Sequence, residues 1–550
     1  MLVARRLYLY FVAGVSLAVL ATGLVNLLEL GLQTLWEALT GTQVILQPPG
    51  AVRRELSLYS ALTVVGLPVW LLHWWLAERL LAPARAEAEA ERRSLIRALY
   101  FAVLLFVAFL LWANAALDLL SWAFEAILDV TEPFTMQPTA EFVIGQLAML
   151  VVVGGIWIYH VWIVLRDRRA GALSGGADWL PRLYLYVGAA FGLVTLLVGA
   201  SQLIQALVDA LFGVGEVVAG DLRRTLAQGA AQLLGGFVVW SLHWGYSLGL
   251  RGQPDWRGEH ERRSLLRWVY LYLGVFAGVA LTLGALAVSL AELFRWALGV
   301  GIGDAAQRLR DIVEPPARVL PVTLLWLYHR RQIHREAEGM PEAGWRVSVG
   351  RLIGYLSALA GLAFAGSGLA LLLGLLLDLL LGGSRVAALP PDWWRDQVSG
   401  YGAVLLVGGL AWLWYWYAAL RRVAADPVAE RASLSRRAYL YIVLAATIVG
   451  MLGSLAVVLY RFLSWVLGVV GGAELVSDIS VPLGTAIVSG LLLAYHLLTL
   501  RQDLREVAER LPAERTVRLT LRLPNDVDPE QAVEELRRHL PPGVELEVAR

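Results

Sequence analysis

A tryptophan and a histidine recur three residues apart inside apolar stretches of this chain. Imidazole is the side chain best suited to bind a metal or relay a proton near neutral pH. Positions i and i+3 share a helix face, so each pair presents one surface. The repeated positions are His73, His160, His243, His329, Tyr415 and His496, and the residues three before them are Trp70, Trp157, Trp240, Trp326, Trp412 and Leu493.

These tetrads have a structural and a chemical interpretation. They stand just before arginine-rich segments, where Trp, Tyr and His of a membrane protein form an aromatic belt at the interface. The chemical alternative is a ring of imidazoles that binds haem or a metal, or that relays protons. Tyr415 interrupts such a ring, and no second ligand type recurs beside it. The pattern therefore favours interfacial anchoring and packing, and it predicts that replacing His160 or His243 by Phe leaves the fold intact.

A second pattern is a polar stripe along one face in the second half of several apolar helices. An ionisable residue at membrane depth costs about 2.5–3.5 kcal/mol at the helix centre and is a functional hypothesis by default. There are two structural alternatives: the last turns protrude beyond the hydrocarbon, or the polar residues hold helices together. For the four deepest residues, Asn26, Asp118, Gln202 and Asp209, the structural and functional interpretations are equally favoured. The candidate residues are Asn26, Asp118, Gln202, Asp209, Glu292, Arg295, Asp378 and Arg461.

The composition identifies the environment of these residues. Hydrophobic residues make up 58% of the 550 positions and charged residues 17%, against about 25% charged in soluble proteins. The chain has no cysteine, which excludes disulfides, thiol catalysis and Cys-ligated metal sites. Its net charge of +1 predicts no bulk attraction to nucleic acid. No phosphate-binding loop or dinucleotide fingerprint occurs in a suitable context, so we expect neither an enzyme nor a cofactor.

Twelve apolar segments are long enough to cross a bilayer, which takes roughly 20 helical residues. Because lipid offers no partner for backbone polar groups, these segments must be helices. The sequence therefore predicts an all-α integral membrane protein of six helix pairs. The segments are 7–36 and 56–78, 96–128 and 141–165, 182–212 and 227–249, 266–298 and 317–333, 351–381 and 401–420, and 437–467 and 481–500.

A longer repeat groups the pairs into three four-helix units. "ERRSLIRALY" at residue 91 returns as "ERRSLLRWVY" at 261 and "ERASLSRRAY" at 430. Each unit crosses the membrane an even number of times, so all units share one orientation, and we expect a pseudo-threefold axis along the membrane normal. The predicted repeats A1, B1, A2, B2, A3 and B3 are residues 1–90, 91–180, 181–260, 261–345, 346–430 and 431–505.

The arginines predict the orientation and the compartment. They are concentrated in the segments between pairs and are sparser in the loops within pairs. The positive-inside rule then places both termini in the cytoplasm. The absence of lysine is typical of a GC-rich bacterium, which indicates the bacterial inner membrane. The first helix is not a removable signal peptide, because its pattern returns at residue 182.

The last segment, residues 506–550, differs from the rest. "RTVRLTLRLP" and "GVELEVAR" alternate like strands, and "DPEQAVEELRRHL" between them is helical, with Asp528 and Pro529 as N-cap and first residue. Two strands do not form a stable sheet alone. We therefore expect this cytoplasmic β-α-β tail to pair with another copy of itself, with a protein partner or with the cytoplasmic linkers.

The helix openings "RRLYLY" and "PRLYLY" and the six similar pairs resemble a bacterial family of polytopic membrane proteins of unknown function, built from tandem two-helix and four-helix repeats. The resemblance covers roughly residues 1–500. It implies the fold and carries no activity or functional residue.

Three function classes remain. The favoured one is a membrane scaffold or accessory subunit of a larger assembly, in contact with lipid and protein partners, because the polar stripe differs between repeats whereas a symmetric pore favours rings of like residues. The alternative is a channel or transporter that uses the acidic stripe. A weaker alternative is a haem-binding electron-transfer protein that uses the histidines.

Overall fold

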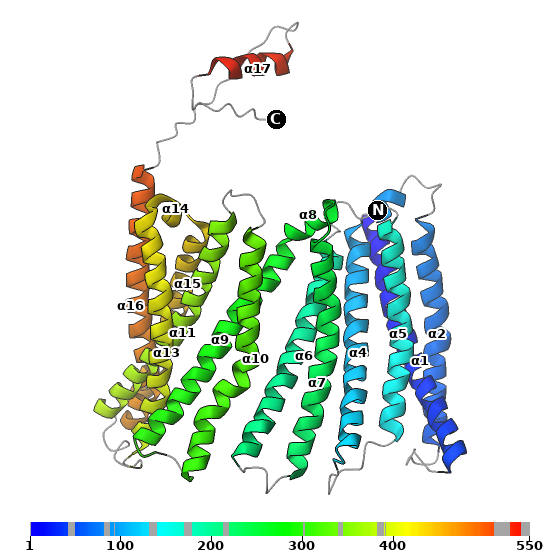
Figure 1. The fold of residues 1–550 in the computed structure, drawn as a ribbon, viewed down its shortest axis with the longest axis horizontal. Coiled ribbons are helices and arrows are strands. Elements are labelled where there is room, and N and C mark those ends of the chain that lie inside the picture. Colours follow the sequence, from blue (N-terminus) through cyan, green and yellow to red (C-terminus); the bar gives the residue numbers. More distant parts are fainter. Residues whose placement is uncertain are drawn as a thin grey trace.

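A computed structural model describes residues 2–41, 50–81, 88–92, 94–130, 140–169, 179–212, 219–300, 303–338, 345–381, 390, 392–510 and 528–540. All regular structure in these residues is helical, and twelve long helices stand side by side (Figure 1). They form six consecutive pairs: α1 (Leu2–Thr40) and α2 (Ala51–Arg79), α4 (Leu95–Ile127) and α5 (Ala140–Arg169), α6 (Trp179–Leu211) and α7 (Ala219–Arg251), α9 (Leu265–Ala297) and α10 (Ala305–Glu338), α11 (Trp345–Leu381) and α13 (Trp393–Ala425), and α15 (Leu434–Val466) and α16 (Gly472–Arg510).

Each predicted apolar segment coincides with one of these helices, four of them ending one residue beyond it, and the second helices begin earlier than predicted. The prediction placed the start of the tenth segment at residue 317, whereas α10 starts at Ala305. The Asp304 carboxylate accepts a hydrogen bond from the Gln307 amide at 2.9 Å and caps the first turn. Polar helix formers extend these helices beyond their apolar parts.

Ten of the twelve long helices are both long and apolar enough to cross a membrane. The other two are α7 and α10. Gln, Gly and Ser residues dilute the apolar character of α7, and α10 opens with Arg308, Arg310 and Asp311. The structure therefore supports an all-α membrane protein with ten candidate spans among the described residues.

One packing rule relates successive pairs. The first helix of each pair packs against the second helix of the next pair, and this contact occurs between α1 and α5, α4 and α7, α6 and α10, α9 and α13, and α11 and α16. First helices of successive pairs also touch. One interface is thus used five times along the chain.

The three units form an open row, which corrects the expected pseudo-threefold arrangement. The extensive helix contacts join helices of the same unit or of adjacent units. Helices α1 and α2 lie at one end of the row and α15 and α16 at the other (Figure 1). A repeated head-to-tail interface closes into a ring only if its rotation divides the circle, and three units do not complete the turn here.

Short helices connect the two pairs within each unit. They are α3 (Ala88–Arg92), α8 (Trp256–Arg262) and α14 (Pro427–Arg431). Asp255 and Asp426 cap α8 and α14 by accepting backbone N–H bonds. We call the end of the row that carries these helices the linker end and the opposite end, with the connections inside pairs, the loop end (Figure 1).

Glycines bring the two helices of a pair into close contact. A Cβ at Gly236 of α7 would overlap the backbone nitrogen of Leu196 in α6, and one at Gly361 of α11 would lie 2.6 Å from the Trp412 nitrogen in α13. Small residues at such crossings allow backbones to approach and increase van der Waals contact in lipid. The row is therefore built from tightly packed pairs.

The tail contributes one described helix, α17 (Pro529–His539). It starts at Pro529, as the sequence predicted. The two predicted strands lie outside the described residues.

Candidate functional site

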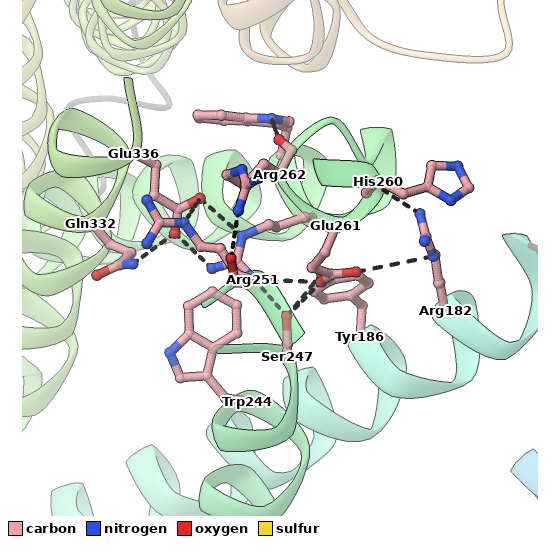
Figure 2. Close-up of polar contacts among 12 residues, drawn as sticks. Arg182, Tyr186, Trp244, Ser247, Arg251, His260, Glu261, Arg262, Gln332 and Glu336 are labelled. Carbon is pink, nitrogen blue, oxygen red and sulfur yellow. Dashed lines mark hydrogen bonds and ion pairs between the residues drawn. The ribbon is translucent and has the colours of Figure 1, made fainter. Parts of the chain in front are cut away.

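Each four-helix unit contains a buried polar cluster at its linker end. In the second unit the guanidinium of Arg267 is fully buried and donates to both carboxylate oxygens of Glu336, with Nε–Oε2 and Nη2–Oε1 distances of 2.9 and 2.6 Å. Its Nη1 donates to the Ser247 hydroxyl at 2.5 Å. Figure 2 shows Ser247, Glu261 and Glu336 converging from α7, α8 and α10.

The other two units repeat this arrangement with equivalent residues. Arg97 donates to Asp167 at 2.8 Å and to the Tyr10 hydroxyl at 2.9 Å. Arg436 donates to Asp503 at 2.5 Å and to the Tyr355 hydroxyl at 3.3 Å. A planar guanidinium suits such paired bonds, and its buried charge requires these partners.

A buried glutamate at the end of each linker helix completes the cluster. Glu91 accepts from Arg6 at 2.6 Å and from Tyr10 at 3.0 Å. Glu430 is bound in the same way by Arg351 and Tyr355, and Glu261 by Tyr186. The polar clusters are therefore Arg6, Tyr10, Glu91, Arg97 and Asp167; Arg182, Tyr186, Glu261, Arg267 and Glu336; and Arg351, Tyr355, Glu430, Arg436 and Asp503.

Each polar cluster holds two positive and two negative side chains and joins four elements. Removing one partner of a buried ion pair typically costs 3–5 kcal/mol. Sequence reasoning used "ERRSLIRALY" only as a repeat marker and missed this role. The available signal was a Glu and an Arg six residues apart in all three copies, at 91 and 97, 261 and 267, and 430 and 436.

The tetrad histidines lie near the linker end but point into the row. His73, His160, His329 and His496 are buried and His243 is half-buried, whereas Trp75, Trp162 and Trp414 face outward. The outward tryptophans match an interfacial belt. The histidines instead pack between helices.

Both imidazole nitrogens of the tetrad histidines have protein partners in several repeats. Nδ1 lies 2.7 Å from the Ile156 carbonyl in the case of His160, and the same contact to the residue four earlier recurs at the other four histidines. A carbonyl only accepts, so Nδ1 carries the proton. Nε2 then accepts from a tyrosine hydroxyl, as at His73 from Tyr8 at 3.1 Å and at His496 from Tyr439 at 3.3 Å. An imidazole bonded in this way has no lone pair left for a metal.

At three junctions the tetrad tryptophan of one pair donates to the tyrosine of the next pair whose ring lies against the next tetrad histidine. Trp157 donates to Tyr184 at 3.2 Å, Trp240 to Tyr270 at 3.0 Å and Trp412 to Tyr439 at 3.1 Å. The Trp–Tyr–His contact thus links neighbouring pairs. No described helix pair follows the sixth tetrad, and there the tryptophan is replaced by Leu493.

The fifth pair explains the tyrosine that interrupts the histidines. Tyr415 occupies the His position, and Ile353 occupies the position where the other first helices carry the bonding tyrosine. The preceding Trp326 accordingly has a buried Nε1 without a hydrogen-bond partner. Both members of the Tyr–His pair have changed together, as packing partners do.

His160→Phe is expected to lower the free energy of unfolding by only about 1 kcal/mol. The ring volume is retained, and the losses are the 2.7 Å bond from Nδ1 to the Ile156 carbonyl and the 3.4 Å contact with the Tyr100 hydroxyl. Denaturant unfolding followed by tryptophan fluorescence measures the change. An absorption band of bound haem, present in the unchanged protein and absent in the variant, would contradict this packing role.

The polar stripe does not converge on one place. Arg310 donates to Asp209 at 2.6 Å, Arg295 to Asp396 at 2.5 Å, and Arg461 lies 3.3 Å from Asp478. Glu292 bonds Arg295 on the same helix. These contacts lie in different helix interfaces along the row.

The remaining stripe residues make weaker contacts or none. Asn26 donates to the Thr22 carbonyl at 2.8 Å. The buried Oε1 of Gln202 and Oδ1 of Asp378 have no hydrogen-bond partner, and Asp118 is exposed on α4. Among the described residues, no group of three His, Asp or Glu is arranged to hold a metal ion.

A cavity of about 670 Å³ lies between α1, α4 and α5. It is almost entirely apolar, with Phe11, Val15 and Val107 among its lining residues, and the stripe residue Asn26 contributes one of its few polar groups. Its dimensions and lining suit a hydrocarbon chain. No pattern in the sequence indicated this cavity.

Comparison with known proteins places the three units in one family. Residues 6–155, 182–324 and 351–491 each match the family model described as Domain of unknown function (DUF5671), and each match falls on one four-helix unit. No curated protein matches the chain, and no solved structure does. Because the three matches cover most of its length, the chain belongs to this family of unknown function, whose domain it carries in three tandem copies.

Proposed function

We propose that this protein is a non-enzymatic scaffold or accessory subunit of a larger membrane assembly. The observation that carries the proposal is the local pairing of charges between helices at the loop end of the row. Asp209 of α6 pairs with Arg310 of α10, and Arg295 of α9 pairs with Asp396 of α13. Each pair joins two adjacent helices, which is the use of polar residues as contacts between helices.

The open row also favours a scaffold. A conduit needs polar faces that surround a common path, and a row presents two broad faces to its surroundings instead. Exposed apolar side chains occur along the whole length, from Phe11 in α1 to Leu463 in α15. Such surfaces suit lipid and the apolar spans of protein partners.

The proposal includes twelve crossings and cytoplasmic termini in a bacterial inner membrane. Helices α7 and α10 have 33 and 34 residues, as long as their neighbours, and pack against α6 and α9. A helix of 33 residues is about 50 Å long, enough to cross beside the others. The arginines of the polar clusters lie at the linker end, which the positive-inside rule assigns to the cytoplasm.

One observation favours the alternative, a channel or transporter. The buried Oδ1 of Asp378 and Oε1 of Gln202 lack partners, and unpaired polar groups inside a membrane often mark a transport path. The two residues lie in α11 and α6, in different units, and form no joint site.

Ion flux into proteoliposomes separates the two functions. We expect no flux of H⁺ or K⁺ above that of empty liposomes, either for the unchanged protein or for the triple variant Asp118→Asn, Asp209→Asn and Asp378→Asn. The triple variant should unfold at a lower temperature, because Asp209 no longer neutralises Arg310.

Asp118→Asn alone is the matched control. Asp118 is exposed and makes no contact whose loss would destabilise the fold, so its melting temperature should be unchanged. A flux in the unchanged protein that the triple variant abolishes, with thermal stability retained, would replace the scaffold proposal by transport.

A further inference from the structure

The interface that repeats between successive pairs leaves one surface unmatched at each end of the row. It joins the first helix of a pair to the helices of the next pair five times. Among the residues that the structure describes, no helix pair follows α15 and α16, and none precedes α1 and α2. We infer that these two surfaces join two copies of the chain head to tail, so that α15 of one copy packs on α1 and α2 of the next.

The face of α15 is the same face that α4 and α9 bury. Positions 109, 279 and 448 are equivalent by the long repeat. Phe109 and Val279 are each 4% exposed, whereas Ile448 is 41% exposed. Phe109 lies against the rings of Phe191 and His243 in the next pair, with centroid separations of 5.6 and 5.2 Å. Ile448 has no such pair to contact.

Closer to the loop end, α15 is again more exposed than α9 at an equivalent position. Ala291 of α9 is buried, and the equivalent residue of α15 is the exposed Tyr460. Helices α2 and α15 are the least buried of the ten candidate spans, with 11% and 17% of their most apolar windows buried. The two terminal helices therefore lack the contacts that the internal pairs have.

The receiving face on α1 is equally uncovered. Tyr184 and Phe191 of α6 are half-buried, and the equivalents on α11, Ile353 and Ala360, are buried. The equivalents on α1 are Tyr8 and Val15, which are 57% and 50% exposed. Ile448 of a second copy would occupy the place beside Val15 that Phe109 occupies beside Phe191.

An arginine at the loop end provides an independent observation. Arg223 of α7 donates to the Asp129 carbonyl after α4 at 3.3 Å, and Arg395 of α13 donates to the Leu298 carbonyl after α9 at 3.2 Å. Each guanidinium thus caps the carboxyl end of the preceding first helix. The equivalent residue of α2 is Arg53, which is exposed, and no helix of a preceding pair is among the described residues.

Lipid covers an apolar face but does not supply the helix carboxyl end that Arg223 and Arg395, the equivalents of Arg53, bind at the internal interfaces. The carboxyl end of α15 supplies it, because Gly468 follows with a φ of 72°, as Gly299 follows α9 with a φ of 69°. The junction between two copies would lack a Trp–Tyr bond, because Leu493 replaces the tetrad tryptophan in the last pair. The junction between α10 and α11 lacks it as well, because Ile353 replaces the tyrosine.

The inference names a second copy of this chain as one partner of the proposed scaffold. An interface of this type uses different surfaces on the two copies and extends to rings or chains of subunits. It differs from the predicted association through the tail. The association of copies is also tested independently of ion flux, because a conducting protein and a scaffold can both associate in this way.

The absence of cysteine in the chain allows a direct test. The double variant Val15→Cys and Ile448→Cys, treated in native membranes with a short bifunctional thiol reagent, should give linked dimers and larger species. The matched control is Val15→Cys with Val449→Cys, because Val449 is exposed at the same depth but about 100° further around the helix. We expect at least a fivefold higher yield for the Ile448 variant, and a severalfold decrease when Arg53→Ala is added.

An internal pair shows that the reagent works at this depth. Phe109→Cys with Phe191→Cys should be linked within one chain. If that pair reacts but the Val15 and Ile448 pair gives no linked dimers, or no more than the Val449 control, then lipid covers these faces and the inference is wrong. Linked dimers of equal yield from Ile448→Cys alone would also overturn it, because they indicate a twofold contact between like surfaces.

Discussion

Replacing Arg267 by methionine is expected to lower the free energy of unfolding by about 3–5 kcal/mol. Its guanidinium is fully buried, bonds Glu336 through two nitrogens and lies 4.7 Å from the ring centre of Trp244. Without this guanidinium, the buried Glu336 carboxylate retains a 2.6 Å hydrogen bond from Gln332, and its nearest remaining positive charge is Arg251 at 3.7 Å. Denaturant unfolding in micelles, followed by tryptophan fluorescence, measures the loss.

Arg263→Met is the matched control, because Arg263 lies four residues earlier and its side chain is 70% exposed in a pair with Glu259. Exposed pairs of this kind contribute about 0.2–1 kcal/mol. Adding Glu336→Leu to Arg267→Met should recover part of the stability, because the double change leaves no unpaired charge at this contact. Equal effects of the Arg267 and Arg263 changes would show that the polar cluster does not stabilise the unit.

The helices and their repeats were predictable because their signals are local. Twenty or more apolar residues in a row determine a helix in lipid whatever surrounds it. The repeated stretches "ERRSL", "ERRSL" and "ERASL" identified the three units, and the family matches fall on the same units. The early start of α10 was not predicted, because its first turns are polar and the apolar criterion does not count them.

The polar clusters were not predicted because their members are far apart in the chain. Arg97 and Asp167 are 70 residues apart, and Arg267 and Glu336 are 69 apart. Only the helix pairing brings them together. A charge seven residues after the tetrad histidine, at Asp167, Glu336 and Asp503, was visible in all three units, but its partner depends on which helices become neighbours.

The arrangement of the units also lies beyond the sequence. Three similar units are compatible with a closed ring or an open row, and the choice depends on the rotation between neighbours. That rotation is determined by side chains such as Phe109 packing between Tyr184 and His243. A repeat in the sequence thus predicts the interface to be repeated but not the angle at which it is repeated.

Gly236→Ala is expected to destabilise the protein by about 1–3 kcal/mol, although alanine is the better helix former. A Cβ at this position overlaps the backbone of Leu196, so α6 and α7 must separate. Gly245→Ala in the same helix is the matched control, because a Cβ there meets nothing within 4 Å. This change should be neutral or stabilise by up to about 1 kcal/mol.

The stability changes expected for Gly236→Ala and Gly245→Ala have opposite signs. Their comparison tests whether close packing between backbones, and not apolar area alone, holds each pair together. Separation of α6 and α7 would also weaken the 3.0 Å bond from Trp240 to Tyr270, which links this pair to the next. Gly236→Ala should therefore shift the tryptophan emission of the folded protein as well as its unfolding midpoint. If both substitutions stabilise to the same degree, helix propensity decides the outcome, and the close approach of α6 and α7 contributes nothing to the row.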